Sequence, residues 1–386
     1  MKKKIDRKIE RNRKIDKFLA EKQPETPCLI VDLDVVSEAY QLLRTYMPIA
    51  KVFYAVKANP AYEVVALLQR LGSSFDVASR GEVDLCLGQG VSADRVSFGN
   101  TIKKERDIAY AFEKGVRLFA FDSEAELEKL ARSAPGARVF CRILVDGEGA
   151  EWPLSRKFGC APEMAVGLLQ RAKAQGLDPY GVSFHVGSQQ TNLDQWDSAV
   201  GRAASMFSLL AQTDINLRMV NIGGGFPAHY RGDVPGVERY AQAVMAAITR
   251  HFGNDLPEII VEPGRSIVGD AGVIQSEVVL ISQKALGDTK RWVYLDVGKF
   301  NGLAETMDES IKYRIRTPVE SGPSGAVVLA GPTCDSADIL YEKTEYRLPM
   351  ALKVGDKLQI LSTGAYTSSY ASVGFNGFSP IKTYCI

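Results

Sequence analysis

One pattern recurs along most of this chain: a short run of β-branched or aromatic residues, followed by a stretch with helical character. Between residues 50 and 265 the pattern occurs eight times. Eight strand–helix cycles in that length are typical of a (β/α)8 barrel of the TIM type. An open, doubly wound sheet shows the same alternation, but the count of eight favours the barrel. The expected strands lie in 51–59, 74–79, 95–100, 118–123, 138–146, 180–188, 219–226 and 258–265.

The pattern changes after Arg265, where helical stretches nearly vanish and short strand-like runs alternate with turns that contain Gly and Pro. A mostly β domain therefore follows the α/β barrel, with strands expected at 273–280, 291–297, 326–330 and 357–361. A further strand at 29–33 precedes the barrel, and we expect it to join the β domain. We divide the chain into a basic helical extension (1–28), a strand and helix leading into the barrel (29–49), the barrel (50–268) and the β domain (269–386).

The composition argues against several classes of protein. Of the 386 residues, 46% are hydrophobic and 24% are charged, as in globular domains. The net charge of +1 argues against a dedicated nucleic-acid-binding protein, and no apolar run has the ~18 residues that a membrane span needs. The six cysteines form no close pair and the three histidines are scattered, so we expect neither a metal site nor a disulfide framework. No signal peptide is recognisable, and we expect a cytoplasmic location.

The first 23 residues are rich in Lys and Arg. A basic segment of this kind can bind nucleic acid or an anionic membrane. Its apolar residues recur at helical spacing, so we expect a solvated amphipathic helix instead. These apolar residues are Ile5, Ile9, Ile15, Phe18 and Leu19.

Polar residues gather at the carboxyl ends of the expected barrel strands, which is where barrel enzymes carry their chemistry. The first strand ends with Lys57, and the eighth ends with Glu262, followed closely by Arg265. The seventh ends in three consecutive glycines. The residues at the ends of the second, fifth, sixth and seventh strands are Asp76, Arg142, His185 and Gly223-Gly224-Gly225.

Lys57 suits Schiff-base chemistry, and the glycine triplet with Arg265 suits phosphate binding. Lys57 stands in an apolar run, where burial lowers the pKa of a lysine and favours the neutral amine that Schiff-base formation needs. The alternative is a lysine whose amine reaches solvent at the rim. The glycines open a loop of backbone N–H groups that can cradle a phosphate, although tight turns also need glycine. Arg265 adds a bidentate phosphate donor.

Five further side chains suit specific roles. Glu262 can hold a cationic ring nitrogen or act as a base, and His185 can stack on a ring or move protons; the alternatives are a capping carboxylate and a core histidine. Cys334 and Asp335 lie side by side on a Gly-Pro turn, where a thiol can protonate a carbanion and a carboxylate can bind an ammonium group. The alternative is a buried turn cysteine. Tyr366 can donate to a phosphate or merely pack.

Six motifs resemble, in order and spacing, those of the fold type III pyridoxal-phosphate (PLP) decarboxylases, which have an alanine racemase-like barrel. The resemblance extends from about residue 29 to residue 380. The Thr-Cys-Asp turn and the FNGF segment at 375–378 are similar to the ornithine/lysine decarboxylase branch, whereas diaminopimelate decarboxylases have a Cys-Glu-Ser type of turn. The motifs are YAVKAN (54–59), FHVGS (184–188), GGGF (223–226), EPGR (262–265), GPTCD (331–335) and GAY (364–366).

The resemblance implies a PLP cofactor held as a Schiff base by Lys57, with Glu262 at the pyridine nitrogen and His185 stacked on the ring. It implies a homodimer with shared active sites, in which Cys334 protonates Cα and Asp335 binds the distal ammonium of the substrate. Cys334 and Asp335 would come from the partner subunit. The remaining cofactor-binding positions that it implies are Asp76, Arg142, Ser188, Gly223, Gly224, Gly225, Gly264, Arg265 and Tyr366.

The implied reaction is decarboxylation of L-ornithine, L-lysine or both, giving putrescine or cadaverine for polyamine biosynthesis. Ornithine decarboxylases usually carry a second Asp before a Gly in the segment that matches 294–300. Here Val297 has that place and Asp296 lies one residue earlier. On a strand such a shift points the side chain to the other face, which puts the second contact to the distal ammonium in question. We therefore expect a longer or looser pocket that admits lysine as well as ornithine. The alternatives are a diaminopimelate or arginine decarboxylase of the same fold and a non-catalytic relative that binds partners.

Overall fold

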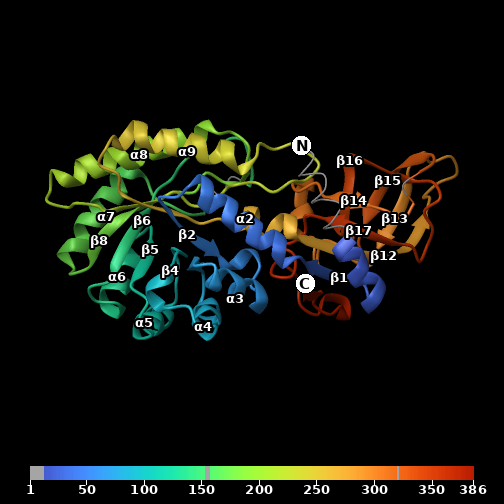
Figure 1. Cartoon of the computed structure of the whole chain (residues 1–386), viewed down its shortest axis with the longest axis horizontal. Coiled ribbons are helices and arrows are strands. Elements are labelled where there is room, and N and C mark those ends of the chain that lie inside the picture. Colours follow the sequence, from blue (N-terminus) through green and yellow to red (C-terminus); the bar gives the residue numbers. More distant parts are fainter. Residues whose placement is uncertain (1–12, 153–156, 320) are drawn as a thin grey trace. The chain divides into compact units, whose positions relative to one another are not determined.

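The computed structural model describes residues 13–152, 157–319 and 321–386. The chain divides into two compact units, which are shown in Figure 1. The barrel unit comprises Ser37–Ala228 and Val234–Ile267. The β unit comprises the chain up to Val36, the short segment His229–Asp233 and the long segment Val268–Ile386.

Eight parallel strands close into a barrel in the order β10-β11-β2-β3-β4-β5-β6-β8. This closure confirms the predicted (β/α)8 fold. The barrel interior is filled by apolar side chains from several strands, among them Phe53, Phe140 and Ile260. The strands are β2 (Ala50–Ala55), β3 (Ser74–Val77), β4 (Val96–Phe98), β5 (Leu118–Phe121), β6 (Arg138–Arg142), β8 (Asp178–Ser183), β10 (Met219–Asn221) and β11 (Glu258–Val261).

Helices follow the barrel strands and lie outside them (Figure 1). Each has one apolar face that packs inward; α9, for example, buries Tyr240, Val244 and Ile248. Acidic residues in the first turns of α3, α5, α6 and α7 match the sign that the helix dipole favours. The helices are α2 (Leu33–Tyr46), α3 (Tyr62–Arg70), α4 (Arg80–Gly88), α5 (Glu105–Glu113), α6 (Glu124–Ser133), α7 (Pro162–Ala174), α8 (Asp194–Ala211), α9 (Val237–Phe252) and the short α10 (Arg265–Val268). Short 3-10 segments are η1 (Val56–Ala58), η2 (Ala93–Arg95), η3 (Gly269–Ala271), η4 (Ala304–Glu309) and η5 (Phe375–Gly377).

Two expectations about the barrel strands were wrong in detail. The first strand ends at Ala55, so Lys57 lies in the 3-10 turn η1, and its side chain is exposed rather than buried on a strand. The run 180–188 is interrupted, because Gly187 has a φ of +96° and separates β8 from a second short strand. That strand, β9 (Ser188–Gln190), pairs with β7 (Ala150–Trp152) in a small antiparallel sheet.

The β unit is built on an eight-stranded sheet with the order β14-β17-β12-β13-β15-β16. Strand β1 pairs with β12 in antiparallel and with β18 in parallel orientation, so the segment before the barrel lies in this sheet. Three strands were not predicted: β14, β16 and β18. The run in β16 was missed because its exposed charged residues conceal the strand. The strands are β1 (Cys28–Val31), β12 (Gly272–Ser282), β13 (Arg291–Leu295), β14 (Arg314–Arg316), β15 (Ser324–Ala330), β16 (Ile339–Pro349), β17 (Lys357–Leu361) and β18 (Lys382–Cys385).

Residues 13–22 form a helix that is more than a solvated extension. Ile15 and Leu19 are buried in a cluster with Ile30 of β1 and Val273 of β12, and Phe18 packs against it. The expected amphipathic face therefore exists, but it packs onto the sheet; Ile5 and Ile9 lie outside the described residues. Among the described helices, none is long and apolar enough to cross a membrane.

Candidate active site

The barrel brings the predicted polar residues to one rim. Lys57 follows β2, Asp76 lies on β3, Arg142 is the last residue of β6, and His185 and Glu262 follow β8 and β11. In a closed parallel barrel the carboxyl ends of all strands meet at the same edge. These five side chains also act electrostatically on one another, as the pKa shifts described below show.

Asp76 is the most buried acid of this group, with 5% of its surface exposed. Burial and then the neighbouring carboxylate of Glu262 raise its pKa well above the usual value, while Lys57 opposes the shift. Its Oδ1 atom has no hydrogen-bond partner. Gly99 makes room for it, because a Cβ atom there would lie 2.0 Å from that oxygen. Sequence reasoning missed Gly99, which directly follows the neighbouring strand β4.

His185 presents a neutral ring. Burial, followed by the cations of Arg142 and Lys57, holds its pKa well below the usual value. The backbone N–H of Gly187 donates to Nδ1 at 3.0 Å, so that nitrogen carries no proton and the ring proton lies on Nε2. A flat, uncharged imidazole at a barrel rim is suited to stacking on an aromatic ring.

Arg142 faces three carboxylates. Burial lowers its pKa, and Glu262, Asp122 and Asp76 act against that shift in this order. Its guanidinium lies 4.9 Å from the centre of the Phe158 ring. The contact and the carboxylates together fix the orientation of this cation beside the rim.

Glu262 is held by a residue that sequence reasoning missed. The Nδ2 group of Asn221, a buried side chain at the end of β10, donates to Oε1 of Glu262. The same side chain accepts the backbone N–H of Gly223 at 2.9 Å through Oδ1. Asn221 therefore links the acid at the eighth strand to the glycine loop at the seventh. A polar amide inside the apolar run MVNI was the signal that could have revealed it.

The glycine loop is tightly enclosed by backbone. A Cβ atom on Gly223, Gly224 or Gly225 would lie 2.5, 2.6 and 2.7 Å from the carbonyl oxygens of residues 184, 262 and 187 respectively. Gly223 and Gly225 have φ values of +66° and +97°, which side chains disfavour. Only glycine fits in this loop, and its backbone can approach an anion closely.

Arg265 lies beside this loop and is 4% exposed. Its Nε and one terminal nitrogen both donate to Oγ of Ser188, at 3.2 and 3.1 Å. The buried Gly264 precedes it. The predicted phosphate residues Ser188 and Arg265, 77 positions apart in sequence, are therefore direct neighbours in the barrel.

Cys334 and Asp335 lie on the turn after β15, and both are exposed. The turn is organised by Asp338, a buried residue that sequence reasoning missed. Its carboxylate accepts hydrogen bonds from the Thr333 hydroxyl at 2.7 Å and from the backbone N–H of Lys299 at 2.7 Å. The backbone N–H of Cys334 donates to Oδ1 of Asn376 in the FNGF segment at 2.9 Å, which ties two of the recognised motifs together.

Two other predicted residues belong to the β unit. Asp296 follows β13, and its Oδ1 atom accepts hydrogen bonds from the Ser276 hydroxyl at 2.6 Å and from the Glu277 N–H at 3.0 Å. Val297 beside it is fully buried. Tyr366 has a left-handed backbone, with a φ of +55°. Their contacts with substrate and phosphate stay predictions.

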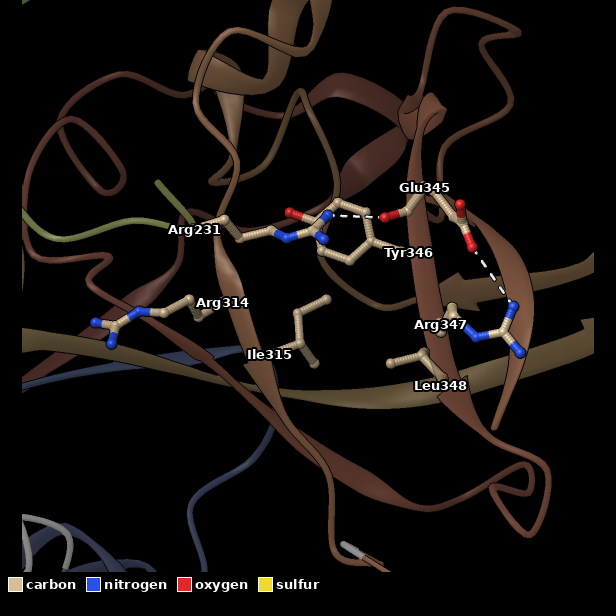
Figure 2. Close-up of a pocket in the computed structure, with 7 residues that line it drawn as sticks. All are labelled: Arg231, Arg314, Ile315, Glu345, Tyr346, Arg347 and Leu348. Atoms are coloured by element: carbon tan, nitrogen blue, oxygen red, sulfur yellow. Dashed lines mark hydrogen bonds and ion pairs between the residues drawn. The ribbon is translucent and has the colours of Figure 1, made fainter. Parts of the chain in front are cut away.

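A separate pocket of about 430 Å³ lies in the β unit and contains none of the predicted site residues. Figure 2 shows Arg231 over the ring of Tyr346, at 4.3 Å, with one nitrogen donating to the Glu345 carbonyl at 2.8 Å. The Glu345 carboxylate pairs with Arg347 at 3.4 Å. The residues that line this pocket include neither a lysine nor a glycine loop, and its one acid is paired with Arg347, so the pocket does not suit the expected chemistry.

The barrel rim has the features that suit PLP. Arg265, Ser188 and the glycine loop lie together and have the donors that a phosphate requires, and the carboxylate of Glu262 has the charge that suits a cationic ring nitrogen. Comparison with known proteins agrees: residues 33–269 match the family model described as "Pyridoxal-dependent decarboxylase, pyridoxal binding domain". The chain belongs to this decarboxylase family.

Individual relatives narrow the branch. The chain is 37% identical over 364 residues to a lysine/ornithine decarboxylase from Selenomonas ruminantium. The matched region covers 94% of this chain and 90% of the relative. A lysine/ornithine decarboxylase from Vibrio vulnificus, solved with cadaverine, is 31% identical with a TM-score of 0.86 and coverages of 96% and 97%. The arginine decarboxylase of Paramecium bursaria Chlorella virus is 26% identical with a TM-score of 0.88 and coverages of 97% and 100%.

These likenesses establish the cofactor and the reaction class. The chain is a PLP-dependent carboxy-lyase that decarboxylates basic amino acids. The predicted family and fold are thereby confirmed.

Proposed function

We propose that this decarboxylase acts on L-ornithine and L-lysine and releases CO2 with putrescine or cadaverine. The observation that carries the proposal is the turn on which a thiol and a carboxylate, Cys334 and Asp335, are both exposed. Both substrates end in an ammonium group, which a carboxylate attracts. The named activity of the Selenomonas and Vibrio relatives supports the same pair of substrates.

The barrel residues hold and tune the cofactor. Lys57 is its attachment point, and Arg265, Ser188 and the loop Gly223-Gly224-Gly225 bind its phosphate. Tyr366 adds a donor to that phosphate. When bound, PLP supplies an electron sink for the electron pair that remains at Cα after CO2 leaves.

Four rim residues adjust the electrostatics of the cofactor site. Glu262, oriented by Asn221, keeps a proton on the ring nitrogen and so strengthens the sink. The neutral imidazole of His185 covers a ring face without adding a competing charge. Asp76 and Arg142 complete the charge balance around the ring, since each lies in the field of Glu262.

The β-unit residues handle the substrate. The Sγ atom of Cys334 gives its proton to Cα once CO2 has left, which fixes the product as an amine. Asp335 binds the distal ammonium; its Oδ1 atom is oriented by the backbone N–H of Ala337 at 2.8 Å. Asp296 is a second, weaker candidate for that ammonium.

We further propose that the enzyme is a homodimer in which Cys334 and Asp335 serve the barrel of a second copy. Their exposure on a turn of one chain fits residues that a second copy would cover. Mixing inactive Lys57→Ala and Cys334→Ala proteins tests this arrangement, because mixed dimers regain one intact site. No recovery of activity after demonstrated subunit exchange would place both groups in one subunit.

A substrate panel tests the main proposal. CO2 release is measured from L-ornithine, L-lysine, L-arginine and meso-diaminopimelate in the presence of PLP, with the Lys57→Ala protein as blank. We expect release from ornithine and lysine, and we expect Asp335→Ala to raise KM for both far more than it lowers kcat. Release from arginine alone would favour the activity named for the viral neighbour. Release from diaminopimelate alone would contradict the role of Asp335, since that substrate has no lone distal ammonium.

A further inference from the structure

Two cysteines of the barrel unit are in contact although they are 19 positions apart in sequence. The Sγ atoms of Cys141, in β6, and Cys160 lie 3.6 Å from each other, and both residues are buried. The sequence spacing had not suggested this pair.

The backbone holds the pair in place. The segment at Cys160 forms a parallel bridge with the end of β6, in which the Cys160 N–H donates to the Arg142 carbonyl at 3.1 Å and the Leu144 N–H donates to the Cys160 carbonyl at 2.9 Å. The preceding Gly159 donates its N–H to Oδ2 of Asp122 at 2.8 Å. Gly159 has a φ of +90°, and a Cβ there would lie 2.9 Å from the Ile143 carbonyl carbon, so this approach requires glycine.

The two thiols are chemically unequal. Burial, followed by the hydrogen bond with Cys160, raises the pKa of Cys141 well above the ordinary value. The hydrogen bond from Cys141 lowers the pKa of Cys160. Cys160 is 5% exposed and Cys141 is fully buried, at 0%. Since the thiolate is the nucleophile in cysteine chemistry and must be reached by the oxidant, the exposure and the pKa directions both favour Cys160 as the sulfur that reacts first and Cys141 as the resolving thiol.

We propose that Cys141 and Cys160 are an oxidisable dithiol, a modification site for two-electron oxidants of the hydroperoxide class. Sγ of Cys160 attacks one peroxide oxygen, the O–O bond breaks, and water leaves with formation of a sulfenic acid. Sγ of Cys141 then displaces a second water and forms the S–S bond. Overall, hydrogen peroxide is reduced to two waters while two thiols lose two electrons and two protons. The two sulfurs, now 3.6 Å apart, must approach to about 2.05 Å.

The location connects the dithiol to the rim. Cys141 directly precedes Arg142, and Phe158, which stacks on the Arg142 guanidinium, lies two residues before Cys160. The backbone bridge already joins the segment that carries Phe158 to Ile143, directly after this arginine. A disulfide would add a covalent link at Cys141, directly before it. The site is independent of the substrate and would be present whichever basic amino acid is decarboxylated.

Peptide mapping of the full-length holoenzyme tests the proposal. The protein is treated with hydrogen peroxide, denatured, alkylated and digested with trypsin, which cleaves after Arg142 and Lys157 and so places the two cysteines on separate peptides. We expect a linked peptide pair that is lighter by two hydrogens than the sum of the two and that separates on treatment with dithiothreitol. Cys86 is a matched control, because it is a buried barrel cysteine whose pKa is raised to about 12; we expect it to remain alkylatable.

Single replacements sharpen the result. Cys141→Ala should leave Cys160 as a sulfenic or higher oxide without a link, whereas Cys160→Ala should leave Cys141 unmodified. The proposal is overturned if Cys141 and Cys160 stay as fully alkylatable as Cys86 in the wild-type protein, or if the link forms instead to the exposed Cys334. The wild-type map decides these points even if a variant fails to fold.

Discussion

The barrel and the β unit present their functional residues in different ways. At the barrel rim, Asp76, Glu262 and Arg265 are oriented by neighbours from other strands: a glycine, a buried amide and a hydroxyl. On the β unit, Cys334 and Asp335 lie on one exposed turn and are oriented mainly by residues within about forty positions of the sequence. The barrel residues are therefore part of the packing that stabilises the fold, whereas the turn residues are nearly free to vary without affecting it.

This difference has a practical consequence for mutations. Changes at the buried rim should alter stability, cofactor binding and catalysis together. Changes at the turn should alter catalysis alone. Lys57 is the exception in the barrel, because it lies beyond the end of β2 and is exposed.

Lys57→Ala should have the largest effect on activity. We expect turnover to fall to the background level, because the attachment point of the cofactor is lost. The free energy of unfolding of the apoprotein should change by no more than about 0.5 kcal/mol, since the side chain is exposed. CO2 release and urea unfolding are the two measurements. A variant that keeps a near-normal rate would show that Lys57 is not the cofactor lysine.

Cys334→Ala tests the β-unit side of the comparison. We expect turnover to fall by roughly 10²–10⁴-fold, as for other general acids, with little change in the unfolding midpoint. Protonation should also go astray in some cycles, so that a transamination product accumulates beside the amine. Chromatography of the products measures this ratio. If the amine is the only product, Cys334 is not the proton donor.

Gly99→Ala tests whether rim residues are coupled to packing. The new Cβ would lie 2.0 Å from Oδ1 of Asp76, so the carboxylate must move. We expect a loss of about 1–3 kcal/mol in the free energy of unfolding, together with weaker PLP binding measured by fluorescence titration. Gly81→Ala in α4 is the matched control, because its Cβ would meet only Oγ of Ser79, at 3.8 Å. Equal behaviour of the two variants would separate Asp76 from the packing of the barrel.

Glu309→Gln should have the smallest effect of these variants, and we expect it on stability only. Glu309 lies in the β unit but outside the turn that carries Cys334 and Asp335. Burial opposes a low pKa for Glu309, but hydrogen bonds to its carboxylate from the Thr344 side chain and from the backbone N–H groups of Glu342, Lys343 and Thr344 lower that pKa to about 2. A carboxyl group whose pKa is lower in the folded than in the unfolded chain stabilises the fold at pH values above its unfolded pKa of about 4.5. This contribution is lost as the pH falls towards the folded pKa of about 2. The variant should be less stable than wild type by about 1 kcal/mol at pH 7. Urea unfolding at several pH values should show the difference shrinking below pH 4.5; a difference that is constant with pH would exclude this carboxylate as its origin.

The architecture could be predicted from local patterns. Strand-like runs that alternate eight times with helical stretches are a property of the sequence itself, and so are the glycine triplet and the lysine at strand ends. The strands of the β unit were harder to recognise, since β16 has charged residues on an exposed face and β14 and β18 are short. A local pattern of apolar residues disappears when only one face of a strand is buried or when the strand has three or four residues.

The fold class, the family and the residue types available for catalysis could be recognised from the amino-acid order alone, because periodicity and motif order depend only on neighbours along the chain. Which residues support one another became visible only in the folded chain. Asn221 reaches Glu262, Gly99 makes room for Asp76 and Cys141 meets Cys160 across segments that are distant in sequence. Such contacts depend on how strands and loops pack in three dimensions, and no local pattern encodes them.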